Sequence, residues 1–122
     1  MKALKKIIKI DTFSCKLEFI VSYDMVKDIN NIYRKYNFDA NFDGDAEGML
    51  LTGNDGVYYL IIDPLYLTHN TIAHEIFHAV IRITKDRDIT DEEACAWLTG
   101  YITEVVYKFL ELKKIDVKHG TK

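Results

Sequence analysis

The chain has 122 residues, of which 48% are hydrophobic and 29% charged, and it carries a formal net charge of −3 at pH 7. This length predicts one domain, residues 1–122, with a single modest core. The net acidity gives no reason to expect a nucleic-acid partner, and no apolar run approaches the roughly 20 residues of a membrane span.

The N-terminus is basic, but Lys9 and Asp11 interrupt it before the apolar core of a signal peptide develops. The two cysteines, Cys15 and Cys95, are too few and too far apart to predict a disulfide framework. We therefore expect a cytoplasmic protein with reduced thiols and no membrane partner. Cys95 is expected to be a small core residue rather than a metal ligand.

Two N-terminal segments, residues 4–11 and 15–22, are rich in β-branched residues and partly alternate, which predicts two strands joined as a hairpin. Asp24 then fits a helix N-cap, and apolar residues follow it at helical spacing. A helix is therefore expected over residues 24–36, covering one face of a sheet.

Residues 37–48 predict a solvated polar loop, since their Asp and Gly residues do not complete the calcium-loop pattern. Residues 49–52 and 57–63 flank Gly53-Asn54-Asp55-Gly56, a strong hairpin signal with two glycines that tolerate positive φ. Pro64 ends the second of these strands.

A further helix is expected after Pro64, capped by Thr68 or Asn70 and reaching about Thr84. The last helix is expected from Asp91 to about Leu112, with Thr90 and Glu93 forming a capping box. The basic tail, residues 113–122, is expected to fray. These elements predict an α+β fold, a small, mainly antiparallel sheet packed against these two helices.

The first of these two helices carries His74-Glu75-x-x-His78, the pattern H-E-x-x-H. Residues four apart lie on one helix face, so the two imidazoles can bind the same metal ion. Glu75 lies about 100° round the helix and can hold a water on that ion without being a ligand. Imidazole and carboxylate groups suit Zn²⁺. With 4 His and 7 Glu in 122 residues, a chain of this composition would contain the pattern by chance roughly 0.007 times.

The residues around the motif are apolar nearly all round the helix, which predicts a buried helix. Buried His and Glu side chains need partners, because each unpaired group costs about 1–3 kcal/mol. A metal ion with a bound water would provide partners for His74, Glu75 and His78 together. The alternative is that the two histidines are structural, bonded to backbone groups, with Glu75 on the helix surface.

Catalytic zinc sites usually have three protein ligands. Asp91, Glu92 and Glu93 can each return to the level of the histidines, because the last helix descends antiparallel to the first. Glu104 lies some 16 Å further along that helix and overshoots the site.

Helical phase aligns Glu93 with Ala96 and Gly100, and these small residues would let the two helices approach closely, which favours Glu93. The alternative is that the three acids cap the helix or complement its dipole. His69 and His119 are weaker ligand candidates, and His69 can instead line the entrance to the site.

Over residues 57–110 the chain resembles zincin metallopeptidases, and more narrowly the gluzincin-like small proteins of phages and mobile elements, loosely related to ImmA/IrrE-type metallopeptidases. The residues that carry the likeness are His74, Glu75, His78, Glu93, Ala96 and Trp97. The resemblance implies that both histidines and Glu93 bind zinc and that Glu75 is the general base. It also implies that the strand before the motif helix, Val57–Asp63, lies beside the cleft and pairs with an extended substrate.

The chain departs from that family in three ways. Glu93 follows His78 closely, no second domain closes a cleft, and no Tyr or His is identified as the oxyanion donor, for which Tyr101 is the best candidate. We expect a zinc-dependent metallopeptidase that hydrolyses a peptide bond through a zinc-activated water, with Glu75 as general base. The alternative is a catalytically inactive zincin-like zinc-binding module that acts through protein–protein interaction.

A third reading is a structural domain without metal. The sequence leaves the substrate and the oligomeric state open. Tyr58, Tyr59 and Tyr66, expected to be exposed, can line either a cleft or an interface.

Overall fold

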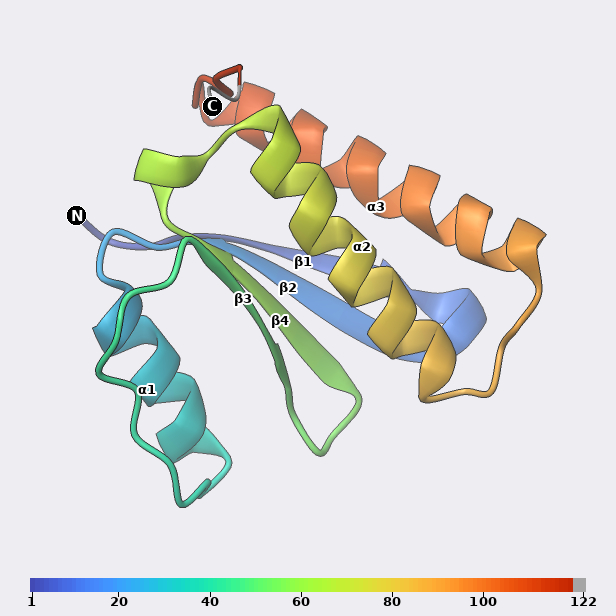
Figure 1. The fold of residues 1–122 in the computed structure, drawn as a ribbon, viewed down its shortest axis with the longest axis horizontal. Helices are drawn as coiled ribbons and strands as arrows, with labels where there is room; N and C mark the ends of the chain where they lie inside the picture. The colour runs from blue at the N-terminus through green and yellow to red at the C-terminus, as the bar shows by residue number, and fades with distance from the viewer. Residues whose placement is uncertain (120–122) are drawn as a thin grey trace.

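The computed structural model describes residues 1–119, which form a four-stranded sheet with helices on both faces (Figure 1). The strands, in their order across the sheet, are β1 (Leu4–Ile10), β2 (Cys15–Val21), β4 (Val57–Ile62) and β3 (Gly48–Thr52). The helices are α1 (Met25–Lys35), α2 (His69–Lys85) and α3 (Glu92–Leu112), with short 3₁₀ turns at Asp11–Phe13 and Pro64–Tyr66. In residues 1–119, no helix is both long and apolar enough to cross a membrane.

Both hairpins predicted from the sequence are present. β1 pairs antiparallel with β2, and β3 pairs antiparallel with β4. The hairpins join in the middle of the sheet, where β2 and β4 run parallel and Lys16 pairs with Val57. The α+β fold with a mainly antiparallel sheet is therefore confirmed, with one parallel pair at its centre.

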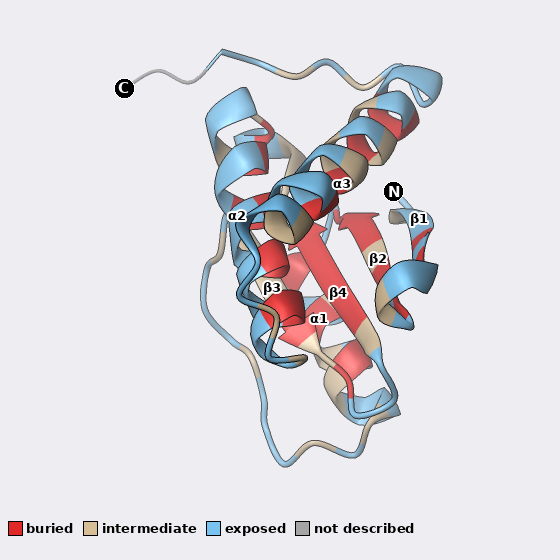
Figure 2. Cartoon of the chain, turned by 90° about the vertical axis from the view of Figure 1, so that its right-hand side faces the viewer, coloured by how far each residue is buried: buried red, intermediate tan, exposed pale blue. Residues whose placement is uncertain are grey.

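The larger core lies between the sheet and the helices α2 and α3. Alternate residues of β2 and β4 point into it, as the two-residue period of a strand requires. Figure 2 shows these strands and the inner faces of both helices as buried. The fully buried contributors include Leu17, Phe19, Leu60, Ile62, Ile72, Ala79, Ile83, Leu98, Ile102 and Val106.

A second core lies on the opposite face of the sheet, under α1 (Figure 1). Met25, Ile29 and Ile32 of α1 pack there against Tyr59 and Ile61 of β4. The prediction that this helix covers one face of the sheet is confirmed.

Side-chain caps fix where the helices begin. The Asp24 carboxylate accepts a hydrogen bond from the Lys27 amide at 3.2 Å, and the Thr68 hydroxyl accepts one from the Thr71 amide at 3.0 Å. The capping box predicted for Thr90 and Glu93 is wrong. α3 is capped by Asp91, whose carboxylate accepts from the Ala94 amide at 3.1 Å, so the helix begins one residue later than that box requires.

The prediction that α2 is buried all round is also wrong. Phe77 is 61% exposed and Ile81 43%, and both histidines of the motif are exposed. The helix belongs to the outer layer, so only the stripe that includes Ile72, Ile76 and Ala79 faces the core.

Two of the three tyrosines expected to be exposed are buried. Tyr58 donates its hydroxyl hydrogen to Asp86 at 2.7 Å and accepts a hydrogen bond from Arg87 at 2.9 Å. The Tyr59 hydroxyl lies 2.6 Å from that of Tyr36. These partners allow the polar ends of both residues to be buried, and of the three only Tyr66 is exposed.

The β3–β4 turn uses its two glycines differently. Gly56 has a φ of +84°, whereas Gly53 does not adopt a positive φ. A Cβ atom on Gly53 would lie 2.5 Å from Cζ of Tyr36, the C-cap of α1, so a side chain here would have to displace the Tyr36 ring.

The C-terminal tail does not fray over residues 113–119. The Lys118 amide donates to the Leu67 carbonyl, and the His69 amide donates to the Lys118 carbonyl, both at 3.0 Å. Ile115 and Val117 pack against the larger core. Residues 120–122, for which fraying was also expected, lie outside the described part of the chain.

Replacing Phe19 by Ala should lower the free energy of unfolding by about 3–5 kcal/mol, because Phe19 is fully buried and packs edge-to-face on Phe109. Urea denaturation of the full chain would measure the loss. Ile7→Ala on β1 is the matched control, since Ile7 is 54% exposed and should cost no more than about 0.5 kcal/mol. Equal losses in the two variants would contradict the described placement of β1 and β2.

Candidate metal centre

The two motif histidines lie on one flank of α2 with their rings close together. Their Nε2 atoms are 3.1 Å apart, and the ring planes are inclined at 81°. The motif's helical spacing is thus realised as two nitrogens that converge on one point outside the helix. Without a metal, this distance is that of a hydrogen bond from one imidazole to the other.

The same distance fits two ligands of a zinc ion. Zinc–nitrogen bonds of about 2.0–2.1 Å at a tetrahedral angle place the two nitrogens about 3.3 Å apart. The separation between His74 and His78 therefore needs to change by only a few tenths of an ångström for both to bind one ion. Both side chains are exposed, so an ion can reach them from solvent.

Glu75, between the two histidines in sequence, turns inward toward β3. It is only 8% exposed, and within residues 1–119 its carboxylate makes no hydrogen bond. A Cβ atom at Gly48 would lie 2.9 Å from both Cγ and Cδ of Glu75 and 3.1 Å from its Oε2. The Glu75 side chain therefore occupies space that exists only because residue 48 has no side chain.

Burial raises the pKa of the Glu75 carboxyl above its ordinary value, because the charged form loses solvation. The neighbouring His74 and His78 rings lower it in part, and the Glu47 carboxylate raises it. A carboxylate with a raised pKa is a stronger base than a solvated one, which suits proton abstraction near neutral pH.

A hollow of about 530 Å³ lies between α2 and β3, and both histidines and Glu75 line it. Its other walls come from the start of β3 and from the C-terminal half of α2. The lining residues outside the motif are Gly48, Met49, Leu50, Ile81, Arg82 and Lys85.

The strand beside this hollow is β3, which corrects the expectation that Val57–Asp63 occupies that place. β4 lies inside the sheet with partners on both sides, whereas β3 is an edge strand paired only with β4. The strand that immediately precedes the motif helix therefore has no free edge to offer a substrate.

The three acids considered as third ligands lie at the start of α3, away from this hollow. Asp91 is the N-cap, and Glu92 and Glu93 form the first turn. α2 packs over β3 and β4, while α3 packs over β1 on the other flank of α2. Glu93 lies in the first turn of α3 and does not line the hollow between α2 and β3.

Within residues 1–119, no three His, Cys, Asp or Glu side chains are grouped so that they could hold a metal ion. His74 and His78 are therefore two ligands of a site whose third ligand the described residues do not supply in place. The assignment of Glu93 as that ligand stays a prediction.

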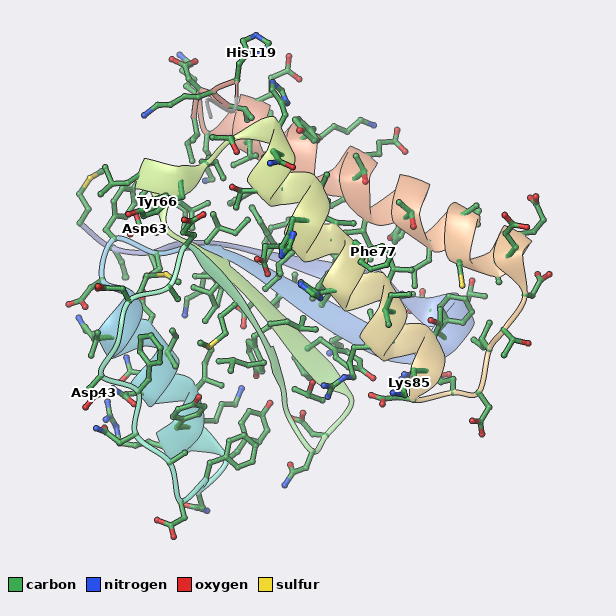
Figure 3. The ribbon with its side chains drawn as sticks, in the orientation of Figure 1. Asp43, Asp63, Tyr66, Phe77, Lys85 and His119 are labelled. Carbon is green, nitrogen blue, oxygen red and sulfur yellow. The ribbon has the colours of Figure 1, made fainter. Side chains whose placement is uncertain are left out.

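The remaining candidates do not line the hollow. The Tyr101 hydroxyl donates to the Lys9 carbonyl at 2.8 Å and the ring stacks on Trp97, which makes Tyr101 a packing residue here. Cys95 packs against the larger core. His69 contacts the Tyr107 hydroxyl at 2.8 Å and the His119 ring. Figure 3 shows His119 beyond the end of α3, at the opposite end of the molecule from Lys85.

No known protein family, curated protein or solved structure matched this chain. What the site can do is therefore argued from its own residues.

Sequence reasoning missed Gly48 and the cationic end of the hollow, Arg82 and Lys85. The composition of residues 37–48 predicts a solvated loop that ends at Gly48, and only the contact with Glu75 reveals the role of this glycine. Arg82 and Lys85 carried a usable signal, because they follow His78 by four and seven residues and so share its helix flank.

Replacing Gly48 by Ala should destabilise the protein by about 1–3 kcal/mol, since the new methyl overlaps Glu75. The same change in a Glu75→Ala background should cost less by at least about 0.5 kcal/mol, because the overlapping atoms are gone. Urea denaturation of the four proteins of this double-mutant cycle measures the coupling. Additive costs would show that Glu75 does not pack on Gly48.

Proposed function

We propose that this chain is a zinc-dependent metallopeptidase in which His74 and His78 bind the ion and Glu75 is the general base. The observation that carries the proposal is the convergence of the two Nε2 atoms to 3.1 Å beside the inward-turned carboxylate of Glu75, which lines the same hollow.

When bound, zinc would supply a Lewis acid that lowers the pKa of a coordinated water to about 7 and polarises a carbonyl group. Glu75 would take a proton from the attacking water at a carboxylate oxygen and pass it to the leaving amine. The missing side chain of Gly48 leaves the space in which that carboxylate lies against β3.

The peptide or protein substrate would lie along β3, the free edge of the sheet beside the motif. Hydrogen bonds between an extended chain and an exposed edge strand provide affinity without requiring a particular sequence. The net charge of −3 gives no support to a nucleic-acid substrate. The two free cysteines, Cys15 and Cys95, are consistent with the cytoplasmic location that we propose.

One observation favours a second function. Because the described residues hold no third ligand in place, the chain also fits a zincin-like module that binds zinc without turnover and acts through protein–protein interaction. The two functions predict the same metal content and differ only in hydrolysis.

The purified full chain should contain about one zinc ion, measured by mass spectrometry of the metal. His78→Ala should lose it, because one imidazole alone does not hold the ion. Glu93→Ala should also lose it if Glu93 is the third ligand and should keep it if water or another residue completes the site. A wild-type protein without zinc, even after reconstitution, would refute both functions.

Glu75→Gln should keep the zinc and lower peptide hydrolysis at least about 100-fold, since it removes the base and preserves the shape of the side chain. Hydrolysis of a fluorescence-quenched peptide library, followed with equal zinc loading, provides the comparison. Unchanged turnover in Glu75→Gln would exclude Glu75 as the base. A zinc-loaded wild type that cleaves nothing would favour the binding module.

A further inference from the structure

The hollow beside the motif continues as a groove along the C-terminal half of α2. His74, His78, Arg82 and Lys85 follow one another at spacings of four, four and three residues, so they share one helix flank. All of them line the space that β3 closes on the other side. Figure 3 shows Lys85 at the C-terminal end of α2, beyond Phe77 in the middle of the helix.

β3 runs in the same direction as α2 along this groove. Its first residue, Gly48, lies against Glu75, and its last residue, Thr52, has its hydroxyl 3.4 Å from Nη1 of Arg82. The seven residues from Glu75 to Arg82 advance about 10 Å along the helix. An extended peptide covers that distance in about three residues.

The outer edge of β3 is open to such a peptide. The Gly53 amide bonds to the Val57 carbonyl, and the Asp63 amide bonds to the Glu47 carbonyl. By alternation, the backbone groups of Gly48, Leu50 and Thr52 point away from β4. In residues 1–119 these groups have no backbone partner on their outer side.

The two edges of the sheet differ in charge. β1, the opposite edge strand, carries Lys5, Lys6 and Lys9. Charged lysine side chains on an edge strand disfavour its pairing with a strand of another chain. The sequence of β3 is Gly-Met-Leu-Leu-Thr, which contains no charged residue. The edge beside the motif is thus the one that lacks protection against strand pairing.

The groove has opposite charges at its two ends. Glu47 and Glu75 lie near the start of β3, and Arg82 and Lys85 lie at the far end. In the described part of the chain the sole ion pair joins Lys108 to Glu104, so neither Arg82 nor Lys85 has a carboxylate partner. Basic residues in the last turn also complement the helix dipole, but that effect does not require them to line the groove.

We propose that the groove binds an extended peptide with an acidic side chain about three residues from the bond held at Glu75, and that Arg82 and Lys85 bind this carboxylate. The guanidinium of Arg82 suits a carboxylate because it donates two parallel hydrogen bonds, and Lys85 adds a second positive charge. Glu47 at the other end repels an acidic residue there, which fixes the register of the peptide. This inference rests on the proposed function and names its substrate class.

Binding tests the inference separately from catalysis. The probes are fluorescein-labelled octapeptides of Ser, Thr and Ala that carry one Glu at a varied position, each with a matched Gln peptide. Fluorescence anisotropy with the full-length, zinc-loaded Glu75→Gln protein should show about tenfold tighter binding of the Glu peptides at the preferred position, as expected for a charge-assisted contact.

The double substitution of Arg82 and Lys85 by Gln should reduce this preference to less than twofold. Lys6→Gln with Lys9→Gln, on the β1 edge, is the matched control, because it removes the same charge from exposed residues outside the groove. This control should keep the preference. Equal effects of the two pairs, or no binding of either peptide set, would overturn the inference.

Cleavage by the wild type then separates the two proposals. Mass spectrometry of the fragments should place the Glu residue about three positions from the broken bond. Hydrolysis without any acidic preference would overturn the inference and leave the peptidase function standing. Selective binding of the acidic peptides without hydrolysis by the zinc-loaded wild type would support the inference and refute the peptidase.

Discussion

The packing of α2 on the β3–β4 side of the sheet is the constraint on which the site depends. The buried stripe of this helix consists of Ile72, Ile76, Ala79 and Ile83, all of which belong to the larger core. Burial of this stripe fixes the rotation of α2 about its axis. The rotation in turn sets His74 and His78 above the edge strand and turns Glu75 down toward Gly48. The geometry of the site is therefore a consequence of hydrophobic packing on the other side of the same helix.

Local sequence signals predicted the elements well because each depends on a few neighbouring residues. Both hairpins, the cap at Asp24 and the helix that carries the motif follow from alternation, turn glycines and capping side chains. The order of strands was not predictable in this way. It depends on the parallel pairing of β2 with β4, which joins residues far apart in the sequence and leaves no local pattern.

The same distinction holds for the site. The spacing of His74, Glu75 and His78 within one helix was enough to predict that the two imidazoles meet. The position of Glu93 depends instead on which flank of α2 receives α3, and helical phase alone does not decide that. The full burial predicted for α2 failed for a related reason. Apolar residues such as Phe77 and Ile81 satisfy a helical pattern but remain exposed, because an outer helix has only one face to bury.

The central place of β4 also has a consequence for how the chain folds. During synthesis, β1, β2 and α1 emerge before β4, but β2 and α1 meet through residues of β4, such as Tyr59 and Ile61. The sheet closes only after a long loop has been brought together, which slows folding because loop-closure entropy is lost before the non-local contacts form. Until then the edge of β2 that later pairs with β4 is open on the nascent chain. The early part of this protein is therefore the part most exposed to aggregation and to chaperones.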